Sequence, residues 1–480
     1  MNPRALVVAA MAAYAAGFSA LSMLRDRAFE TGRFDLGNMV QAVWATAHGH
    51  PLRVTNLRGD QISRLGSHVD PILVLLAPLW WVWPSADGLL VAQAVAIALG
   101  ALPVFWLVRK HLGSERAAAG FALAYLLLPA VQWLTLNEFH PVALACPLLL
   151  YAFWFLDSDR LVPFALFAIL AAATKEEIAL VVAGFGLWYA LSRRRRVAGA
   201  AIVAISVGWA ALAIGVVIPH FNHGAGPGFY SRYGEVGGSP GGILRTALHH
   251  PARLVSKAFS EHRLHYLGQL ALPLAGLWVA APLVLVAAVP ELALNLLSSN
   301  EYQTSIHFHY TAGAIPPLVV ASVLGAGRLA HRRPAWTMRL AVLAVSVALL
   351  ENYHLGAIPL WSRVPGGQSF QAGFADVSAH DRVAARALRL IPGDAVVSAT
   401  NSLGAQLSAR RRVLSFPLLA DATWVAVDER KLSYLDRSSA PRAAGPALAR
   451  LRRNQTWRLV FDSDGVLVFS RSSSPSSSGS

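Results

Sequence analysis

Long apolar runs recur from the N-terminus to about residue 356. An α-helix needs about 20 apolar residues to cross the hydrocarbon core of a bilayer, and many of these runs are near or above that length. Because a segment in lipid must satisfy its own backbone N–H and C=O groups, we predict helices. The eleven expected spans are 5–24, 87–108, 117–136, 142–156, 161–174, 178–192, 199–218, 267–283, 284–298, 309–328 and 339–356. Within them, Pro282 and Pro290 could break the stretch 267–298 into a re-entrant segment.

Two polar stretches between these runs are too long to be simple connectors and are predicted as outer loops, 25–86 and 219–266. In the first, Phe34 to Ala47 has apolar residues at helical spacing, which is typical of a helix on the membrane surface. The run from Pro71 to Trp83 is too short to cross comfortably, and its tryptophans suit the headgroup boundary. It is predicted as a second interfacial or re-entrant helix. The second loop contains a Gly-rich segment, 222–242, which could close over a bound substrate.

The pattern changes after residue 356. Short strand-like runs alternate with helical stretches at 376–391 and 444–453, and the strand-like runs are 395–398, 412–416, 424–427, 458–461 and 466–469. The chain is therefore predicted to be an α-helical polytopic membrane protein over 1–356, with a small C-terminal α/β domain over 357–471. The Ser-rich stretch 472–480 is predicted to be a disordered tail.

Composition and charge agree with this fold class. Of the residues, 55% are hydrophobic and 14% charged, and the mean hydropathy is +0.47. The net charge of +15 does not indicate a nucleic-acid partner, because the basic residues gather in short loops between apolar runs, as in proteins that follow the positive-inside rule. These loops contain Arg109, Lys110 and Arg116; Arg193 to Arg196; and Arg328, Arg332, Arg333 and Arg339.

Residues 5–24 are long enough to span and lack a clear small-residue cleavage site, so we expect a retained first helix. With Arg4 inside, the eleven spans are expected to leave the C-terminal domain outside the plasma membrane. The single cysteine, Cys146, excludes an intramolecular disulfide and a Cys-based zinc site.

Ionisable residues near membrane depth are costly and usually functional. In the expected topology they lie at the outer ends of helices, in four motifs and before Pro71. They are Asp35 in RFDLGNMVQ; Glu138 and His140 in NEFHP; Lys175 and Glu176 in TKEE; Gln303, His307, His309 and Tyr310 in YQTSIHFHY; and His68 and Asp70 before Pro71.

Each motif also has a purely structural interpretation. Asp35 could cap its helix, NEFHP could be a polar hairpin whose Pro141 begins the next helix, and Lys175 could pair with a neighbouring carboxylate. The histidines of HFHY could be interfacial hydrogen-bonding groups or metal ligands, although His-x-His alone is a weak metal signal.

Taken together, five stretches resemble a bacterial membrane-protein family catalogued only as a domain of unknown function. They are FDLGNMVQAVW, SHVDPILVLLAPLWWVWP, LNEFHPVALACPLLL, TKEE and NLLSSNEYQTSIHFHY. The similarity covers nearly the whole chain, and the layout of helices and outer loops resembles the GT-C superfamily of membrane glycosyltransferases. That resemblance implies transfer of a sugar from a polyprenyl-phosphate donor to an acceptor at the outer face of the membrane.

The resemblance also implies roles for the candidate residues. Asp35 matches the superfamily's first-loop catalytic acid and is expected to be the general base. Glu138 and His140 take the place of the second-loop acidic group, and the other candidates are expected to bind substrate. Among these, Lys175, His307 and His309 are expected to stabilise the departing phosphate. The first loop lacks the Asp-Glu or Asp-x-Asp pair of better-known members, which leaves a divalent cation as an open question.

Two other functions stay open at this point. A transporter or flippase of a lipid-linked or small polar solute is favoured by the proline-interrupted stretch around Pro282 and Pro290. A non-catalytic GT-C-like membrane protein would instead use the C-terminal domain to recruit a partner. In each case the expected partners are membrane lipids, and the sequence does not define the oligomeric state.

Overall fold

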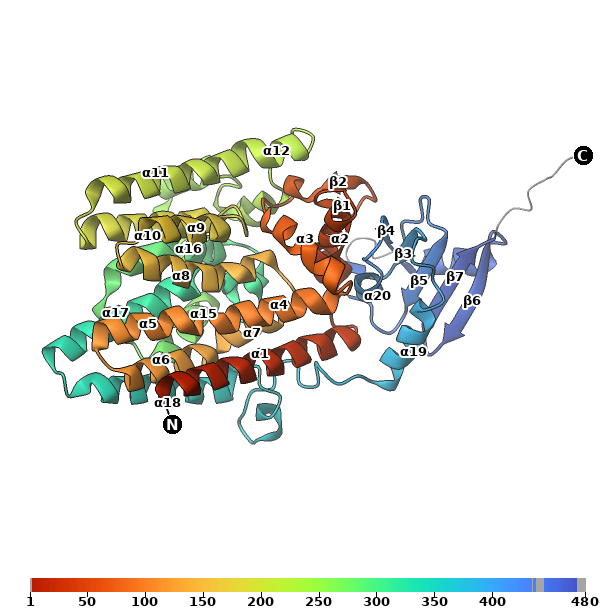
Figure 1. Ribbon diagram of the computed structural model, residues 1–480. Coiled ribbons are helices and arrows are strands. Elements are labelled where there is room, and N and C mark those ends of the chain that lie inside the picture. Colours follow the sequence, from red (N-terminus) through yellow and green to blue (C-terminus); the bar gives the residue numbers. More distant parts are fainter. Residues whose placement is uncertain (1, 434, 437–443, 473–480) are drawn as a thin grey trace, which may run out of the picture. The chain divides into compact units, whose positions relative to one another are not determined.

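A computed structural model describes residues 2–433, 435–436 and 444–472 of the chain (Figure 1). The chain divides into two compact units. Unit 1 comprises Met1–Ser19, Leu65–Ile72 and Val91–Ala372, and unit 2 comprises Ala20–Arg64, Leu73–Leu90 and Gly373–Ser480. The predicted disordered tail lies outside the described residues from position 473 onward.

Unit 1 is a bundle of helices (Figure 1). In it α10 packs on α11, α8 on α9, α18 on α6, and α17 on α5. The helices that lie wholly or partly in unit 1 are α1 (Pro3–Arg27), α4 (Ala86–Leu99), α5 (Ala101–Leu112), α6 (Glu115–Leu127), α7 (Pro129–Leu136), α8 (Ala145–Asp157), α9 (Leu161–Ala172), α10 (Ile178–Ser192), α11 (Arg196–Leu212), α12 (Ile218–Phe221), α13 (Pro240–His249), α14 (Pro251–Ala258), α15 (Glu261–Ala271), α16 (Val289–Leu297), α17 (Ile315–Arg332) and α18 (Trp336–Leu355).

Four helical stretches of the described chain are long and apolar enough to cross a membrane, namely Pro3–Arg27, Ala86–Leu112, Arg196–Phe221 and Trp336–Leu355. A fifth is the pair Glu115–Leu127 and Pro129–Leu136, which is bent by 50°. Several other predicted spans are shorter apolar helices of 10–17 residues. The helical character of the apolar runs is thus confirmed, whereas the count of eleven spans stays a prediction.

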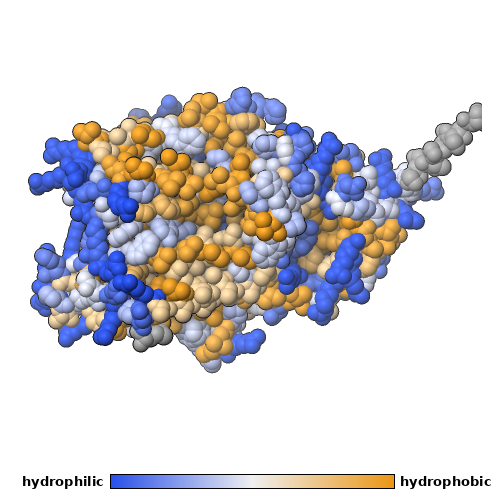
Figure 2. All heavy atoms as spheres, in the orientation of Figure 1, coloured by the Kyte–Doolittle hydropathy of each residue, from blue (hydrophilic) through white to orange (hydrophobic). Residues whose placement is uncertain are grey.

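The flank of the bundle is apolar. Figure 2 shows hydrophobic residues over the sides of the helices and hydrophilic residues at one end. On α11, for example, Val197 and Ile205 are 87% and 73% exposed. Large apolar side chains exposed along a whole helix indicate a lipid environment rather than water.

The stretch 267–298 differs most from the prediction of two continuous spans. Helix α15 ends at Ala271, and three short 3₁₀ segments follow before α16 begins: η6 (Leu272–Leu274), η7 (Leu277–Ala280) and η8 (Pro282–Ala288). Between the first two, Ala275 and Gly276 adopt positive φ angles of 56° and 67°. Pro273 and Pro282 lie at the starts of two of these segments. A proline has no N–H to donate and its ring clashes with the preceding turn, so it suits the start of a helical segment but interrupts an α-helix that would continue through it.

One end of unit 1 collects the basic loops. At the end of α8, the Asp157 carboxylate pairs with Lys110 Nζ at 2.7 Å, with His111 Nε2 at 2.9 Å and with Arg193 at 2.5 Å. These partners lie at the ends of α5 and α10. Helix α17 ends on the same side, because its Gly327 abuts His111.

Helices α8, α10 and α17 therefore all begin at the opposite end of the bundle. The motifs NEFHP, TKEE and HFHY directly precede these three helices. A 13-residue helix such as α8 is about 20 Å long, so these motifs are separated from the basic loops by roughly that distance. The bundle thus places the candidate residues of these motifs at one end and the strongly basic loops at the other.

Unit 2 is built around a five-stranded sheet with the order β4-β3-β5-β7-β6. Strand β3 is parallel to β4 and β5, whereas β7 is antiparallel to β5 and β6. This confirms the expected C-terminal α/β fold. The elements are β3 (Val397–Ala399), β4 (Val413–Ser415), β5 (Trp424–Asp428), β6 (Trp457–Ser463), β7 (Val466–Arg471), α19 (Ala379–Leu388), α20 (Asn401–Gln406) and α22 (Ala444–Arg453).

The first polar stretch folds into the same unit as this sheet. It contains the π-helical turn η1 (Arg33–Gly37), α2 (Asn38–Ala47), a hairpin of β1 (Arg53–Thr55) and β2 (Gln61–Ser63), and α3 (Ile72–Val82). The two helices were predicted, whereas the three-residue strands were not. Phe29, just before η1, is buried in one core with Val397, Leu403 and Val468. The C-terminal sheet and the first polar stretch therefore share a hydrophobic core.

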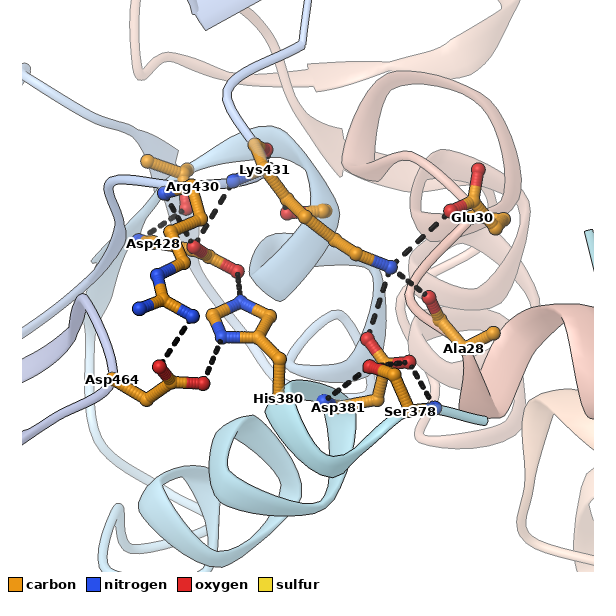
Figure 3. Close-up of polar contacts among 11 residues, drawn as sticks. Ala28, Glu30, Ser378, His380, Asp381, Asp428, Arg430, Lys431 and Asp464 are labelled. Atoms are coloured by element: carbon orange, nitrogen blue, oxygen red, sulfur yellow. Dashed lines mark hydrogen bonds and ion pairs between the residues drawn. The ribbon is translucent and has the colours of Figure 1, made fainter. Parts of the chain in front are cut away.

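A charged network crosses unit 2 (Figure 3). His380 on α19 is bonded on both ring nitrogens, by Nε2 to Asp428 at 2.9 Å and by Nδ1 to Asp464 at 3.0 Å. Arg430 pairs with the same Asp464. Burial lowers the pKa of His380, but the two carboxylates outweigh it and raise that pKa above its ordinary 6.5.

The stability of unit 2 is expected to fall as the pH rises. A raised folded-state pKa means that the contribution of His380 is fully present below pH 6.5 and is lost as the pH passes through the folded-state value. We expect faster amide hydrogen exchange in α19 and β5 of the full-length protein above neutral pH than at pH 6, after correction for the intrinsic exchange rate. In His380→Gln this pH dependence should disappear. An equal pH dependence in the variant would assign it to another group.

Candidate functional site

Ten of the eleven residues predicted from the sequence lie in unit 1. The exception is Asp35, which lies in unit 2. Within unit 1, the residues come from the segment 65–72, the turn after α7, the turn between α9 and α10, and the segment 303–310 that leads into α17.

Glu176 in the TKEE turn is almost fully buried and anchors the segment that carries His68. Its carboxylate accepts hydrogen bonds from His68 Nδ1 and from the Val69 N–H, both at 2.9 Å. Burial alone raises the pKa of Glu176, but His68, Lys175 and the Val69 N–H outweigh it, so that pKa falls to about 2. Glu176 is therefore ionised, and it orients the His68 ring so that Nε2 points away from the pair.

Lys175, its neighbour, is also largely buried and forms an ion pair with Glu177. Its Nζ lies 5.7 Å from the centre of the Tyr310 ring. Burial lowers the pKa of Lys175, but the carboxylates of Glu177, Glu176 and Glu291 raise it well above its ordinary value. Pairing with a neighbouring carboxylate, the structural interpretation of this lysine, is thus observed, and the ammonium also faces an aromatic ring.

The NEFHP turn and the HFHY segment meet at Asn137. The Asn137 side-chain oxygen accepts the His309 N–H at 2.9 Å and lies 3.1 Å from His309 Nδ1, while its backbone carbonyl lies 2.7 Å from His140 Nδ1. The two imidazoles stack, with centroids 3.8 Å apart. Burial lowers the pKa of His309 well below its ordinary value, so its ring is neutral at physiological pH. The two motifs are therefore in direct contact.

The remaining candidates are His307, Asp70 and Glu138, which are packed against other residues or wholly or partly buried. His307 packs against Phe370, with ring centroids 3.7 Å apart, and against Trp133. Burial lowers the pKa of His307 to about 4. Asp70 is buried, and Glu138 is half-buried in a left-handed backbone conformation, φ 54°.

Arg232 joins this set, although sequence reasoning missed it. It lies in η5 (Gly228–Val236), within the Gly-rich segment. Its guanidinium is 3.4 Å from both Gln303 Oε1 and the Tyr310 hydroxyl, and 5.8 Å from the centre of the Tyr310 ring. Lys175 and Arg232 thus both approach one tyrosine. In the described part of the chain no carboxylate lies within 4.0 Å of Arg232, so its charge is not neutralised by an ion pair.

Glu291 in α16 was also missed. Its side chain is buried beside Gly313, and its Oε2 has no hydrogen-bond partner among the described residues. The three carboxylates that act electrostatically on Lys175 come from two segments, the TKEE turn and α16. Within the described residues, no group of three or more His, Cys, Asp or Glu side chains is arranged to hold a metal ion.

Asp35 lies at the centre of η1 in unit 2 and is half-buried. The positions that flank the turn as caps are Gly32 and Asn38, and Gly37 caps α2. Asp35 therefore lies within the first turn of this helical segment, between the flanking positions.

Comparison with solved structures gives the same fold. The chain is similar to ArnT from Cupriavidus metallidurans bound to undecaprenyl phosphate, with a TM-score of 0.53 and 14% identity over 96% of this chain and 97% of that one. The apo state of ArnT gives a TM-score of 0.51 and 12% identity over 91% and 93% of the two chains. A family model described as "Predicted membrane protein (DUF2079)" matches residues 25–468. No curated protein sequence matches the chain.

Proposed function

The chain belongs to the DUF2079 family of predicted membrane proteins and has an ArnT-like fold, and from these premises we propose that it is a membrane glycosyltransferase. The membership and the fold confirm the resemblance stated from the sequence. In the proposed reaction, a sugar moves from a polyprenyl-phosphate donor to an acceptor at the outer face of the plasma membrane. The convergence of Lys175, Arg232 and His309 on Tyr310 is the observation that carries the proposal.

This cluster has the chemistry to hold the donor phosphate. Lys175 is paired with Glu177, whereas no carboxylate of the described residues lies within 4.0 Å of Arg232, so Arg232 is the cation beside Tyr310 that is available to a phosphate. An arginine can donate two parallel hydrogen bonds to a phosphate. Such donors are most effective where negative charge develops, here on the departing phosphate. Binding of undecaprenyl phosphate by a protein of this fold supports the lipid class.

The chemical step is a single displacement at the anomeric carbon. Asp35 accepts the proton of the acceptor hydroxyl as its oxygen bonds to that carbon. The bond from carbon to the phosphate oxygen breaks, and the electron pair leaves with the lipid phosphate. Glu138 and His140 orient the substrates, and Glu176 fixes His68. By analogy with inverting glycosidases, the anomeric configuration inverts.

A transfer assay separates this function from its main rival. Purified protein in nanodiscs is incubated with polyprenyl-phosphate sugars labelled in the sugar and with extracted envelope acceptors. A glycosyltransferase breaks the sugar–phosphate bond and labels the acceptor. A transporter or flippase, which the interrupted stretch 272–288 favours, moves the intact lipid across a proteoliposome membrane instead. Intact donor after incubation with every acceptor fraction, together with such movement, would overturn the proposal.

Undecaprenyl phosphate is expected to stabilise the protein. A ligand that binds only the folded state at 100 times its Kd raises the free energy of unfolding by about 2.7 kcal/mol. We therefore expect a higher unfolding temperature with undecaprenyl phosphate than with undecaprenol, which has the same chain and no phosphate. Equal shifts with the two lipids would show that the chain, rather than the phosphate, is recognised.

A further inference from the structure

The turn that carries Asp35 is held by a buried arginine. Arg33 is only 1% exposed, and Arg33 Nε donates to Ser415 Oγ at 2.9 Å. Its NH1 donates to the carbonyls of Thr55 and Val413, both at 3.2 Å. Burial lowers the pKa of Arg33 to about 10. A charged group is costly to bury, so these hydrogen bonds to β1 and β4 fix the start of the turn.

Both ends of the turn also touch the C-terminal domain closely. A Cβ added at Gly32 would lie 2.6 Å from Asn401 Nδ2, and one added at Gly37 would lie 2.5 Å from Ser408 Oγ. Between them, the Phe34 N–H donates to Asn401 Oδ1 at 3.2 Å. The backbone on either side of Asp35 therefore packs directly against α20 and the residues that follow it.

The segment before the turn is tied to the same domain. Lys431 Nζ donates to the Ala28 carbonyl at 2.7 Å and pairs with Glu30 at 3.2 Å and with Asp381 at 2.9 Å (Figure 3). Upstream, the Gln406 side chain donates to the Asp26 carbonyl at 2.8 Å. The contacts of Lys431 with Ala28 and Glu30, and of Gln406 with Asp26, join residues that are more than 350 positions apart in the sequence.

The segment after the turn is held in the same way. The Gln41 amide donates to the carbonyls of Arg410 and Arg411, both at 3.2 Å, and accepts the Thr55 N–H at 2.8 Å. The C-terminal domain thus contacts the chain before, within and after the five-residue turn Arg33–Gly37, which contains Asp35.

We propose that the C-terminal α/β domain is the scaffold that holds the Asp35 turn in its reactive conformation, with Arg33 and Gly37 as positioning residues. This inference rests on the proposed function for the role of Asp35. A simple packing contact would not need the buried guanidinium of Arg33, which donates to three acceptors. It would also not need two glycines, Gly32 and Gly37, at the points where the turn approaches Asn401 and Ser408 closely. A π-helical turn is rare, and such turns are frequent at functional sites.

Gly37 and Ser408 offer a steric test of this scaffold. The φ and ψ of Gly37 are −60° and −40°, which suit any residue in a right-handed helix, so the obstacle to an added methyl group is the Ser408 hydroxyl. We expect Gly37→Ala to lower kcat about tenfold or more, with the KM for the donor unchanged, because a shift of about 1 Å in a reacting group can cost 100-fold. Ser408→Ala alone should keep kcat near the wild-type value, and the double variant should regain it.

Amide hydrogen exchange gives a readout that does not depend on activity. Gly37→Ala should raise the exchange of residues 33–41, and the added Ser408→Ala should restore protection. If Gly37→Ala does not fold, Ser415→Ala replaces it; the loss of one hydrogen bond to Arg33 should lower kcat about threefold or more and raise exchange in the same residues.

The outcomes separate the two proposals. Rescue of both kcat and protection in the double variant is the expected result. Wild-type kcat in Gly37→Ala, or a double variant as impaired as Gly37→Ala, overturns the scaffold. If the wild-type protein transfers no sugar to any acceptor, the proposed function fails instead, and the exchange measurement alone decides whether the domain holds the turn.

Discussion

Asp35→Asn is expected to lower the rate of sugar transfer by about 100- to 10,000-fold, the range that a positioned general base contributes. Asparagine has the size and shape of aspartate, so the turn Arg33–Gly37 should keep its conformation. The amide cannot accept the hydroxyl proton of the acceptor at neutral pH. The loss should appear in kcat measured at saturating labelled donor, whereas thermal stabilisation by undecaprenyl phosphate should be retained.

Asp60→Asn is the matched control for this variant. Asp60 is exposed in the first polar stretch, where Asp60 Oδ2 accepts a hydrogen bond from the Asn56 side chain. The same change of charge there should leave kcat within about twofold, as expected of surface substitutions away from a site. Full transfer activity in Asp35→Asn would remove Asp35 from the reaction.

The sequence was most informative where charged residues interrupt apolar runs. A buried Glu or Lys needs a partner, so TKEE in apolar surroundings indicated interactions with other segments. The structure supplies one as the Glu176–His68 pair, whereas Lys175 pairs within the motif, with Glu177. The helices and the strands after residue 395 could be predicted for a different reason. Their pattern of hydrophobic residues repeats within each element and can be seen in the sequence of that element alone.

Arg232 and Glu291 could not be found in this way. Arg232 lies in a polar, Gly-rich segment, where one arginine looks like a solvated charge, and only the fold brings it to Tyr310. Glu291 lies in PELALNLL, within the predicted span 284–298, and only the fold brings it near Lys175. Neither contact leaves a periodic signal in the sequence.

The contacts between the first polar stretch and the C-terminal sheet also leave no periodic signal in the sequence. In the sequence, Arg33 has the features of an ordinary surface arginine. Its hydrogen-bond acceptors on β4, the Val413 carbonyl and Ser415 Oγ, are 380 and 382 positions away. Contacts at such separation are specified by shape and by single hydrogen bonds, which no local pattern encodes. The role assigned to the C-terminal domain therefore had to come from the structure.

Arg232→Gln is expected to lower kcat/KM for the lipid donor by about 100- to 1,000-fold, the usual cost of removing one donor that stabilises developing charge. Glutamine keeps a donor for Gln303 or Tyr310 but removes the positive charge beside them. Arg232→Lys should recover part of the loss, because lysine keeps the charge without the two parallel donors. Initial rates over a range of donor concentrations measure both effects.

Arg245→Gln provides the control for the Arg232 variants, since Arg245 is an exposed arginine on α13, the helix that packs beside η5. Loss of the same charge there tests for a general electrostatic attraction of the anionic lipid, which would weaken with added salt. If Arg245→Gln and Arg232→Gln reduce kcat/KM equally, and the loss disappears at high salt, Arg232 acts only through the overall charge. If Arg232→Gln alone is impaired at every salt concentration, its guanidinium contacts the phosphate directly, because a short-range contact is screened far less than an interaction across solvent.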